Sequence, residues 1–271
     1  MSTWVELGDR VFVRRYEFYD QNIGVVLGDG EALVIDTRAT HVQGREILAD
    51  LRMLTADPVT VVINTHGHFD HAFGNHVFRP ATIWAQAGCP PFLARTGEAR
   101  RARISASEPG IATDLAEVEI DLPDRVFAET ARIEFGGRAV DLRYLGRGHT
   151  DHDIVISVPD ADVVFAGDLI EGGNVPFFND AYPLDWPETA SRLAELVLGT
   201  VVPGHGDHAG WAFANAQAMA IAAIVELGRR IHSGELGLEA ALDLTPLPEF
   251  PREDMRAPLL RTLAQLQGEL D

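Results

Sequence analysis

Short apolar runs rich in β-branched residues recur along the first two hundred residues and alternate with longer amphipathic stretches. Residues 11–15, 23–27 and 32–36 have the composition of strands. The sequence Gly28-Asp29-Gly30 between the last two runs is typical of a hairpin turn. We therefore expect the chain to open with three short strands, the second and third of them joined as a hairpin.

An amphipathic helix and a buried strand are expected next. Thr40 is a suitable N-cap for a helix over residues 44–54, whose apolar side chains recur three or four positions apart. Residues 59–63 form a continuous β-branched run, which is the pattern of a strand buried on both faces. This strand ends directly at Asn64-Thr65-His66.

A similar succession follows in the second half of this region. Gly136-Gly137 separates two apolar runs and predicts another hairpin, and a helix is expected from about Pro187. The further strands are expected at residues 132–135, 140–144, 154–158, 163–166 and 201–202. Two such successions predict an α/β (α+β) fold in which two sheets pack face to face with helices outside. We expect this domain to cover residues 1–207, with residues 208–271 as a helical C-terminal extension packed on it.

The charge and the cysteine content indicate the cellular compartment of the protein and the partners that it can bind. The chain has 22 basic and 41 acidic residues, a net charge of −19. Such a surface repels phosphate backbones, so no nucleic acid partner is expected. The single cysteine, Cys89, excludes an internal disulfide, and the first residues lack the features of a signal peptide. No stretch reaches the roughly 20 apolar residues of a membrane-spanning helix, so we expect a cytoplasmic protein without a membrane partner.

The segment that follows the buried strand at residues 59–63 carries the strongest chemical signal. It places three imidazoles and one carboxylate within six residues, as His66, His68, Asp70 and His71. These are ligand types suited to zinc and other divalent first-row ions. Gly67 permits the sharp turn that would direct neighbouring ligands to one point. The segment therefore predicts a metal site.

Three later segments share one construction, in which an expected strand end is followed by a glycine and then by a ligand-type residue. They end in His149, Asp168 and His205. Each alone is weak, since a lone Gly-Asp is usually a turn and a lone Gly-His is usually an ordinary loop histidine. Together with the first segment they predict ligands that converge at one edge of a sandwich.

These motifs resemble those of the metallo-β-lactamase superfamily, namely His-x-His-x-Asp-His, a distant His, a Gly-Asp and a late His. The resemblance covers roughly residues 5–206 and implies a four-layer αβ/βα sandwich with two divalent metal ions at its edge. It implies zinc, with iron or manganese as the other candidate metals. The implied ligands are His66, His68 and His149 for one ion, Asp70, His71 and His205 for the other, and Asp168 as the bridge.

The chemistry that the resemblance implies is metal-assisted hydrolysis. A hydroxide bridging two cations forms near neutral pH, because the cations lower the pKa of bound water toward about 7. Asp70 is the residue expected to orient this hydroxide and to shuttle its proton, so it is the expected catalytic residue.

Asp168 distinguishes between branches of the superfamily. Lactamase families that resemble this fold commonly have a cysteine or a non-ligating residue at that position, whereas an aspartate resembles glyoxalase II-like thioesterases, lactonases and other two-metal hydrolases. We therefore expect a hydrolase of a small-molecule ester, thioester, lactone or amide rather than a true β-lactamase. The strongest alternative is a mononuclear iron dioxygenase of the persulfide type. A β-lactamase and a non-catalytic binding protein rank below both.

Three further segments have open roles. Asp151 or Asp153 either orients a ligand histidine or caps the next strand. The aromatic-rich segment 14–22 either covers the site or packs against the sandwich. The apolar segment 172–186 forms either a substrate wall or a contact between subunits, and a homodimer is the candidate assembly.

Overall fold

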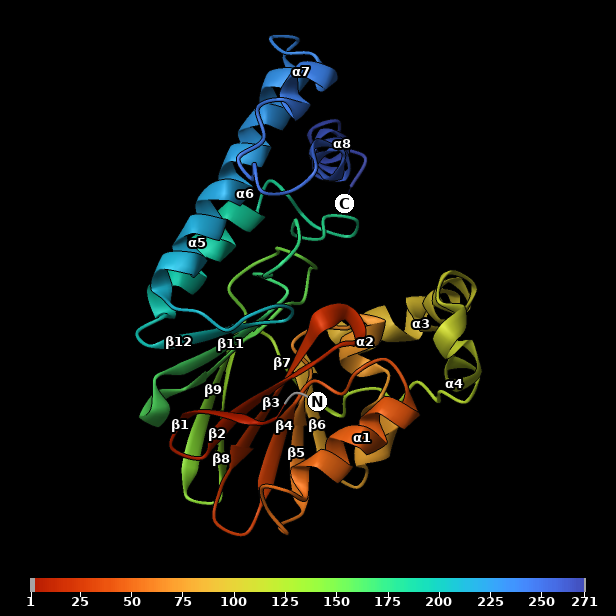
Figure 1. Cartoon of the computed structure of the whole chain (residues 1–271), viewed down its shortest axis with the longest axis vertical. Coiled ribbons are helices and arrows are strands. Elements are labelled where there is room, and N and C mark those ends of the chain that lie inside the picture. The colour runs from red at the N-terminus through yellow and green to blue at the C-terminus, as the bar shows by residue number, and fades with distance from the viewer. Residues whose placement is uncertain (1–2, 271) are drawn as a thin grey trace. The chain divides into compact units, whose positions relative to one another are not determined.

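The computed structural model describes residues 3–270, and the chain folds into two compact units (Figure 1). The first unit holds the chain up to Tyr144 together with Ile156–Ala161. The second unit holds Leu145–Val155 and the chain from Asp162 onward. The domain boundary expected after residue 207 lies within the second unit, and it stays a prediction.

A seven-stranded sheet with its strands in sequence order belongs to the first unit. Its strands are β1 (Val5–Gly8), β2 (Val11–Tyr16), β3 (Gln21–Leu27), β4 (Ala32–Ile35), β5 (Val59–Ile63), β6 (Thr82–Gln86) and β7 (Arg125–Phe127). Neighbours from β1 to β4 are antiparallel, and those from β4 to β7 are parallel. The strands expected at 11–15, 23–27, 32–36 and 59–63 are confirmed. Because β5 lies between two parallel neighbours, Val61, Val62 and Ile63 are buried. The buried end of β5 fixes the position at which the next segment begins.

The first long helix, α1 (His41–Leu51), begins at the expected cap. The Thr40 side chain accepts the N–H of Gln43 at 3.1 Å, so the helix starts directly after Thr40, as the expected cap requires. Ile47 and Leu51 pack in the same core cluster as the sheet residue Val62. The other helical segments of the unit are η1 (Phe18–Asp20), α2 (Phe69–Ala72), η2 (Asn75–Phe78), α3 (Cys89–Ser107), η3 (Pro109–Ile111), α4 (Ala112–Ala116) and η4 (Pro159–Ala161).

The second sheet has five strands in the order β12-β11-β10-β9-β8. They are β8 (Thr130–Phe135), β9 (Arg138–Arg143), β10 (Val155–Val158), β11 (Val163–Gly167) and β12 (Thr200–Pro203), at the positions expected from the apolar runs. In the first unit, β8 and β9 form an antiparallel hairpin through Gly136 and Gly137, both of which have positive φ. In the second unit, β11 and β12 are parallel neighbours.

The described part of the second unit contains helical segments that follow β11 and β12 in the chain. They are α5 (Trp186–Leu196), α6 (Trp211–His232), α7 (Leu238–Leu242), η5 (Arg252–Met255) and α8 (Arg256–Leu266), so the expected helical C-terminal region is confirmed. Leu193 of α5, Ile221 of α6 and Leu259 of α8 lie fully buried in one apolar cluster. Burying such a side chain is worth about 1.5–3 kcal/mol, so this cluster fixes α6 firmly against its neighbours.

Among residues 3–270, α6 is the one helix whose length and composition would also suit a membrane span. Half of its apolar 18-residue stretch is buried within the protein, and the core helix of a folded domain can have the same length and composition.

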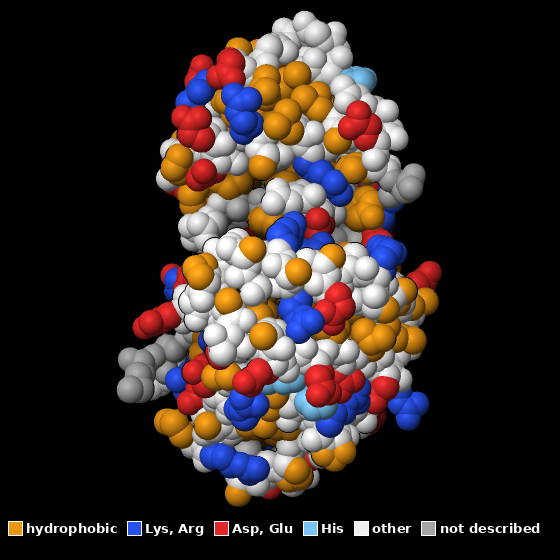
Figure 2. All heavy atoms as spheres, turned by 90° about the vertical axis from the view of Figure 1, so that its right-hand side faces the viewer, with side chains coloured by type: hydrophobic (Ala, Val, Ile, Leu, Met, Phe, Trp, Pro, Cys, Tyr) orange, Lys and Arg blue, Asp and Glu red, His pale blue; other side chains and the backbone are white. Residues whose placement is uncertain are grey.

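Charged side chains of both signs are interspersed on the face drawn in Figure 2. Ion pairs such as Arg79 with Asp121, at 2.7 Å, join side chains of opposite charge on the first unit.

Candidate metal centre

Four of the expected ligands lie together in the first unit, on the segment that leaves β5. His66 and His68 precede α2, and Asp70 and His71 lie within it. The imidazole centroid of His66 is 4.7 Å from that of His68 and 4.2 Å from that of His71. Asp70 Oδ2 is 3.5 Å from His71 Nε2. All four side chains are buried, and we refer to them as the first ligand group.

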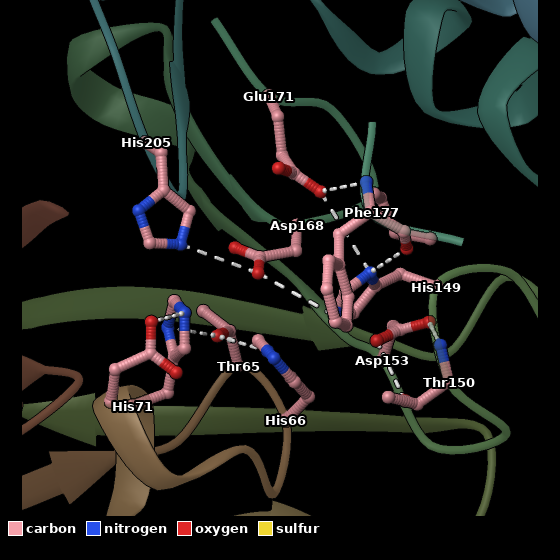
Figure 3. Close-up of polar contacts among 12 residues, drawn as sticks. Thr65, His66, His71, His149, Thr150, Asp153, Asp168, Glu171, Phe177 and His205 are labelled. Carbon is pink, nitrogen blue, oxygen red and sulfur yellow. Dashed lines mark hydrogen bonds and ion pairs between the residues drawn. The ribbon is translucent and has the colours of Figure 1, made fainter. Parts of the chain in front are cut away.

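Asp36, which sequence reasoning missed, fixes the rings of two of these histidines (Figure 3 shows the rings and Thr65). Its Oδ2 accepts the Nδ1–H of His71 and the hydroxyl of Thr65, each at 2.8 Å. Its Oδ1 accepts the backbone N–H of Thr65 at 2.8 Å. The Thr65 oxygen in turn accepts the Nδ1–H of His66 at 3.1 Å. Because a carboxylate only accepts, this network assigns both imidazole protons to Nδ1, and Nε2 carries the lone pair that a metal needs.

The backbone of α2 is fastened from several sides. The carbonyl oxygen of His71 accepts the backbone N–H of Thr37 at 2.9 Å and the side-chain amide of Asn64 at 3.0 Å. The side-chain amide of Gln21 donates to the carbonyl oxygen of Asp70. Buried polar groups that are satisfied in this way hold a short helix whose own four residues could not stabilise it.

The other three expected ligands lie together in the second unit, and we refer to them as the second ligand group (Figure 3). Asp168 follows β11 and His205 follows β12, while His149 comes from the segment after β9. Because β11 and β12 are parallel, their carboxyl ends meet at one edge of the sheet. Asp168 Oδ2 is 3.5 Å from His149 Nε2 and 3.4 Å from His205 Nε2. A single buried carboxylate thus lies between two imidazole nitrogens.

Two glycines make this arrangement of the second ligand group possible. A Cβ atom at Gly204 would lie 1.8 Å from Asp168 Oδ1, far inside van der Waals contact. Gly167, directly before Asp168, has a φ of +54°, in the left-handed region that favours glycine. The Gly-Asp and Gly-His pairs of the sequence therefore have a steric cause.

Glu171 and the backbone of Phe177 flank the other side of the His149 ring (Figure 3). The Nδ1–H of His149 donates to the carbonyl oxygen of Phe177 at 3.1 Å, and Glu171 Oε1 lies 3.8 Å from the same nitrogen. Since a carbonyl only accepts, the His149 proton is assigned to Nδ1 and Nε2 faces Asp168. Burial, reinforced by the neighbouring Asp168 carboxylate, raises the pKa of Glu171. Sequence reasoning did not single out Glu171.

The short segment after His149 supports that ligand through the backbone. Asp153 accepts both the N–H and the hydroxyl of Thr150, each at 2.7 Å. Asp151 pairs with His152 instead, at 2.5 Å between Oδ1 and Nδ1. Of the two carboxylates with open roles, Asp153 therefore fixes the turn that carries His149.

The aromatic residues of segment 14–22 divide between the two roles considered for them. Tyr16 is buried and donates its hydroxyl to Asp50 of α1 at 2.8 Å, so it packs in the core of the first unit. Tyr19 is 40% exposed, and its ring centroid lies 5.6 Å from that of Phe69, which precedes Asp70. Tyr19 therefore borders the first ligand group, and Phe18 packs against the apolar cluster that contains Phe69.

The donor atoms of both ligand groups fit a divalent metal ion. Imidazole nitrogens and carboxylate oxygens are borderline-to-hard ligands of the kind that zinc takes in catalytic sites. Asp168 and Glu171 place two carboxyl groups in a buried space, where a cation would offset their negative charge. Strand ends that present buried His and Asp groups define a metal-binding α/β protein.

Comparison with known proteins identifies the family. A model described as "Metallo-beta-lactamase superfamily" matches residues 16–205, and the chain belongs to this superfamily. The type 2 metallo-beta-lactamase of Bacteroides fragilis is 22% identical over 77% of this chain and 76% of its own length. That of Bacillus sp. (strain 170) is 26% identical over 68% of this chain and 66% of its own length, just under two thirds of that relative.

Solved structures extend the comparison to the fold. A metallo-beta-lactamase from Pontibacter korlensis superposes with a TM-score of 0.66 at 19% identity, covering 81% of this chain and 99% of that chain. TMB-1 superposes with a TM-score of 0.65 at 20% identity, covering 82% of this chain and 97% of that chain. The expected αβ/βα sandwich fold is thereby confirmed. Superfamily membership and the two His/Asp groups together indicate a metal-dependent hydrolase.

Proposed function

We propose that the first and second ligand groups together hold two divalent metal ions, with zinc as the expected metal. The two proposed sets are His66, His68, His149 and Asp168, and Asp70, His71 and His205, with Asp168 shared between the ions. One observation carries the proposal. In both groups a protein acceptor engages histidine Nδ1 (that of His66, His71 or His149), which directs the Nε2 lone pair toward the metal position.

The proposed reaction is hydrolysis of an acyl bond. Bound divalent ions would lower the pKa of a coordinated water toward about 7 and would polarise the substrate carbonyl. Asp70 has the central role among the protein groups, because its carboxylate takes the proton of the attacking water and returns it to the leaving atom. Burial of both ligand groups excludes bulk water from these charges, which strengthens each electrostatic interaction.

The proposed substrates are small-molecule esters, thioesters, lactones or amides. The net charge of −19 disfavours polyanionic substrates such as nucleic acids. The relatives named as metallo-beta-lactamases make a cyclic amide a necessary member of any substrate panel. An aspartate at position 168 favours a two-metal hydrolase of the thioesterase or lactonase kind over a dedicated lactamase. We propose a cytoplasmic location on the single cysteine.

The test combines metal analysis with a substrate screen. Purified protein is assayed for bound metal and then against chromogenic esters, thioesters, lactones and a cephalosporin. We expect two zinc ions per chain and turnover in at least one acyl class. Asp168→Asn should lose metal and activity together. Asp162→Asn, a matched change at the start of β11, should retain both, because Asp162 lies at the opposite end of that strand. Equal metal content and activity in the Asp168 variant would contradict the proposed centre.

Oxygen dependence separates the hydrolase from the alternative chemistry. A hydrolase continues to turn over under anaerobic conditions, whereas a persulfide dioxygenase consumes oxygen and stops without it. One iron ion per chain together with strict oxygen dependence would replace the proposed function with the dioxygenase.

A further inference from the structure

We infer that Gln217, on the C-terminal helix α6, is a positioning residue for the metal ligand His149 and acts on it through Glu171 and the Phe177 peptide. The inference rests on the proposed function in taking His149 as a metal ligand. All four residues belong to the second unit. Gln217 lies 46 positions beyond Glu171 in the sequence, so no local pattern connects them.

The first link is a reciprocal pair of hydrogen bonds between a side chain and a backbone. Gln217 Oε1 accepts the backbone N–H of Glu171 at 2.6 Å, and Gln217 Nε2 donates to the carbonyl oxygen of the same residue. Both residues are buried. The glutamine amide therefore meets both backbone groups of Glu171, and this fixes the position and the rotation of that residue relative to α6.

The second link runs from the Glu171 side chain to the imidazole (Figure 3). Glu171 Oε1 accepts the backbone N–H of Phe177 at 2.9 Å, and the carbonyl oxygen of Phe177 accepts the Nδ1–H of His149 at 3.1 Å. Glu171 thus holds the segment whose carbonyl fixes the tautomer of the ligand. Without this hold, the carbonyl could turn away and Nδ1 would lose the acceptor that keeps its proton in place.

The segment between Asp168 and α5 needs external anchors, because it contains neither helix nor strand before Trp186. Gln265 of α8 provides the anchor at its far end, since its Oε1 accepts the backbone N–H of Leu184 at 2.8 Å. Gln217 provides the corresponding anchor at the near end, next to the ligand. Both are glutamines that reach the same segment from helices of the second unit, but Gln217 alone of the two bonds to Glu171.

That symmetry supplies a matched experiment, with Gln217→Met as the test and Gln265→Met as the control. Methionine has nearly the same length as glutamine and suits a helix, but it removes both hydrogen bonds. Zinc affinity is measured by competition with a chelator. The His149 tautomer is read from long-range ¹H–¹⁵N spectra of the metal-free protein at pH 8. Loss of a group that bonds to a metal ligand typically weakens metal binding by about 10–100-fold. Because Gln217 acts through Glu171 and Phe177, we expect the low end of this range, about tenfold, for Gln217→Met.

The two variants should differ in a way that a general loss of stability would not produce. Wild type and Gln265→Met should show the His149 proton on Nδ1, whereas Gln217→Met should show a mixture of tautomers and weaker zinc binding. Unchanged zinc affinity and an unchanged spectrum in folded Gln217→Met would overturn the inference. If wild type binds no zinc but Gln217→Met still shifts the tautomer, the proposed function fails and the positioning role stands.

A second pair of variants covers the case in which Gln217→Met does not fold. Glu171→Gln keeps an oxygen that can accept the Phe177 N–H, whereas Glu171→Met removes it. We expect Glu171→Gln to keep the wild-type tautomer and Glu171→Met to lose it. If the His149 proton leaves Nδ1 in both variants, the charge of Glu171, rather than its hydrogen bond, acts on His149. This result would also refute the inferred route through the Phe177 peptide.

Discussion

The substitution Asp36→Asn tests how far a single buried carboxylate controls the first ligand group. Asp36 accepts three hydrogen bonds, from His71 Nδ1, from the Thr65 hydroxyl and from the Thr65 backbone N–H, each at 2.8 Å. Asparagine has the same shape and tolerates the positive φ of 64° at this position. It replaces one acceptor oxygen with a donor, however, so it cannot satisfy all three partners.

Either orientation of the new amide has a definite cost. If its NH₂ group faces His71, that ring must present Nδ1 as an acceptor, and the proton moves to Nε2, where it blocks metal binding. If its NH₂ group faces the Thr65 backbone N–H, two buried donors oppose each other, at a cost of about 1–3 kcal/mol. A loss of metal affinity of about 10–100-fold corresponds to about 1.4–2.8 kcal/mol. The two outcomes are therefore similar in free energy, and both should contribute.

The assay for Asp36→Asn is zinc competition combined with thermal unfolding of the metal-free protein. We expect zinc affinity to fall by about tenfold or more, with some loss of stability. Asp124→Asn is the control. Asp124 also accepts a backbone N–H, from Ile83 at 2.9 Å, but Ile83 is not part of either ligand group. Wild-type zinc affinity and an unchanged unfolding temperature in Asp36→Asn would refute the assigned tautomers.

Three further changes have defined outcomes. Asp70→Ala should abolish turnover more completely than it reduces metal content, because its neighbouring ligand His71 remains; parallel loss of both would refute the proton-transfer role. Gly204→Ala should displace the Asp168 carboxylate and lower zinc content, as measured by metal analysis of the folded variant, and a full metal complement would contradict the steric account. Partial burial opposes ionisation of Asp124, yet the Ile83 N–H and the Arg79 guanidinium lower the pKa of this carboxyl below its usual value. Its stabilising contribution is therefore present above about pH 4 and is lost as the pH falls further, so the stability difference between wild type and Asp124→Asn, measured by denaturant titration, should shrink with acidification.

The parts of the fold that were predictable have patterns confined to a few consecutive residues. β5 is a continuous β-branched run because parallel neighbours bury it on both sides, and α1 begins where Thr40 can accept a backbone N–H. β6 was missed because it is only five residues long, buries only Ile83 and Ala85, and ends in the polar Gln86. β7 is only three residues long, two of them exposed, so burial leaves almost no trace in its sequence.

The candidate site was predictable for the same reason only as far as its ligands. His66, His68, Asp70 and His71 are close in sequence, and a glycine precedes each of the later three ligands. Asp36 looks like an ordinary turn residue at a strand end, and its partner His71 lies 35 positions away. Gln217 looks like one polar residue on an amphipathic helix. The contacts that orient the ligands exist only once distant segments meet, so no local pattern contains them.

The contact between Gly204 and Asp168 has a consequence for how this chain can evolve. Any side chain at position 204 overlaps the carboxylate, whereas Gly30 and Gly234 have open space around them. Substitutions at positions 30 and 234 therefore meet no steric overlap, although the new residue must adopt a positive φ. Position 204 accepts only glycine while residue 168 is an aspartate. A shorter residue at 168 would reopen position 204. The residues at positions 168 and 204 are therefore expected to change together. A directed-evolution library that randomises one position should randomise the other as well.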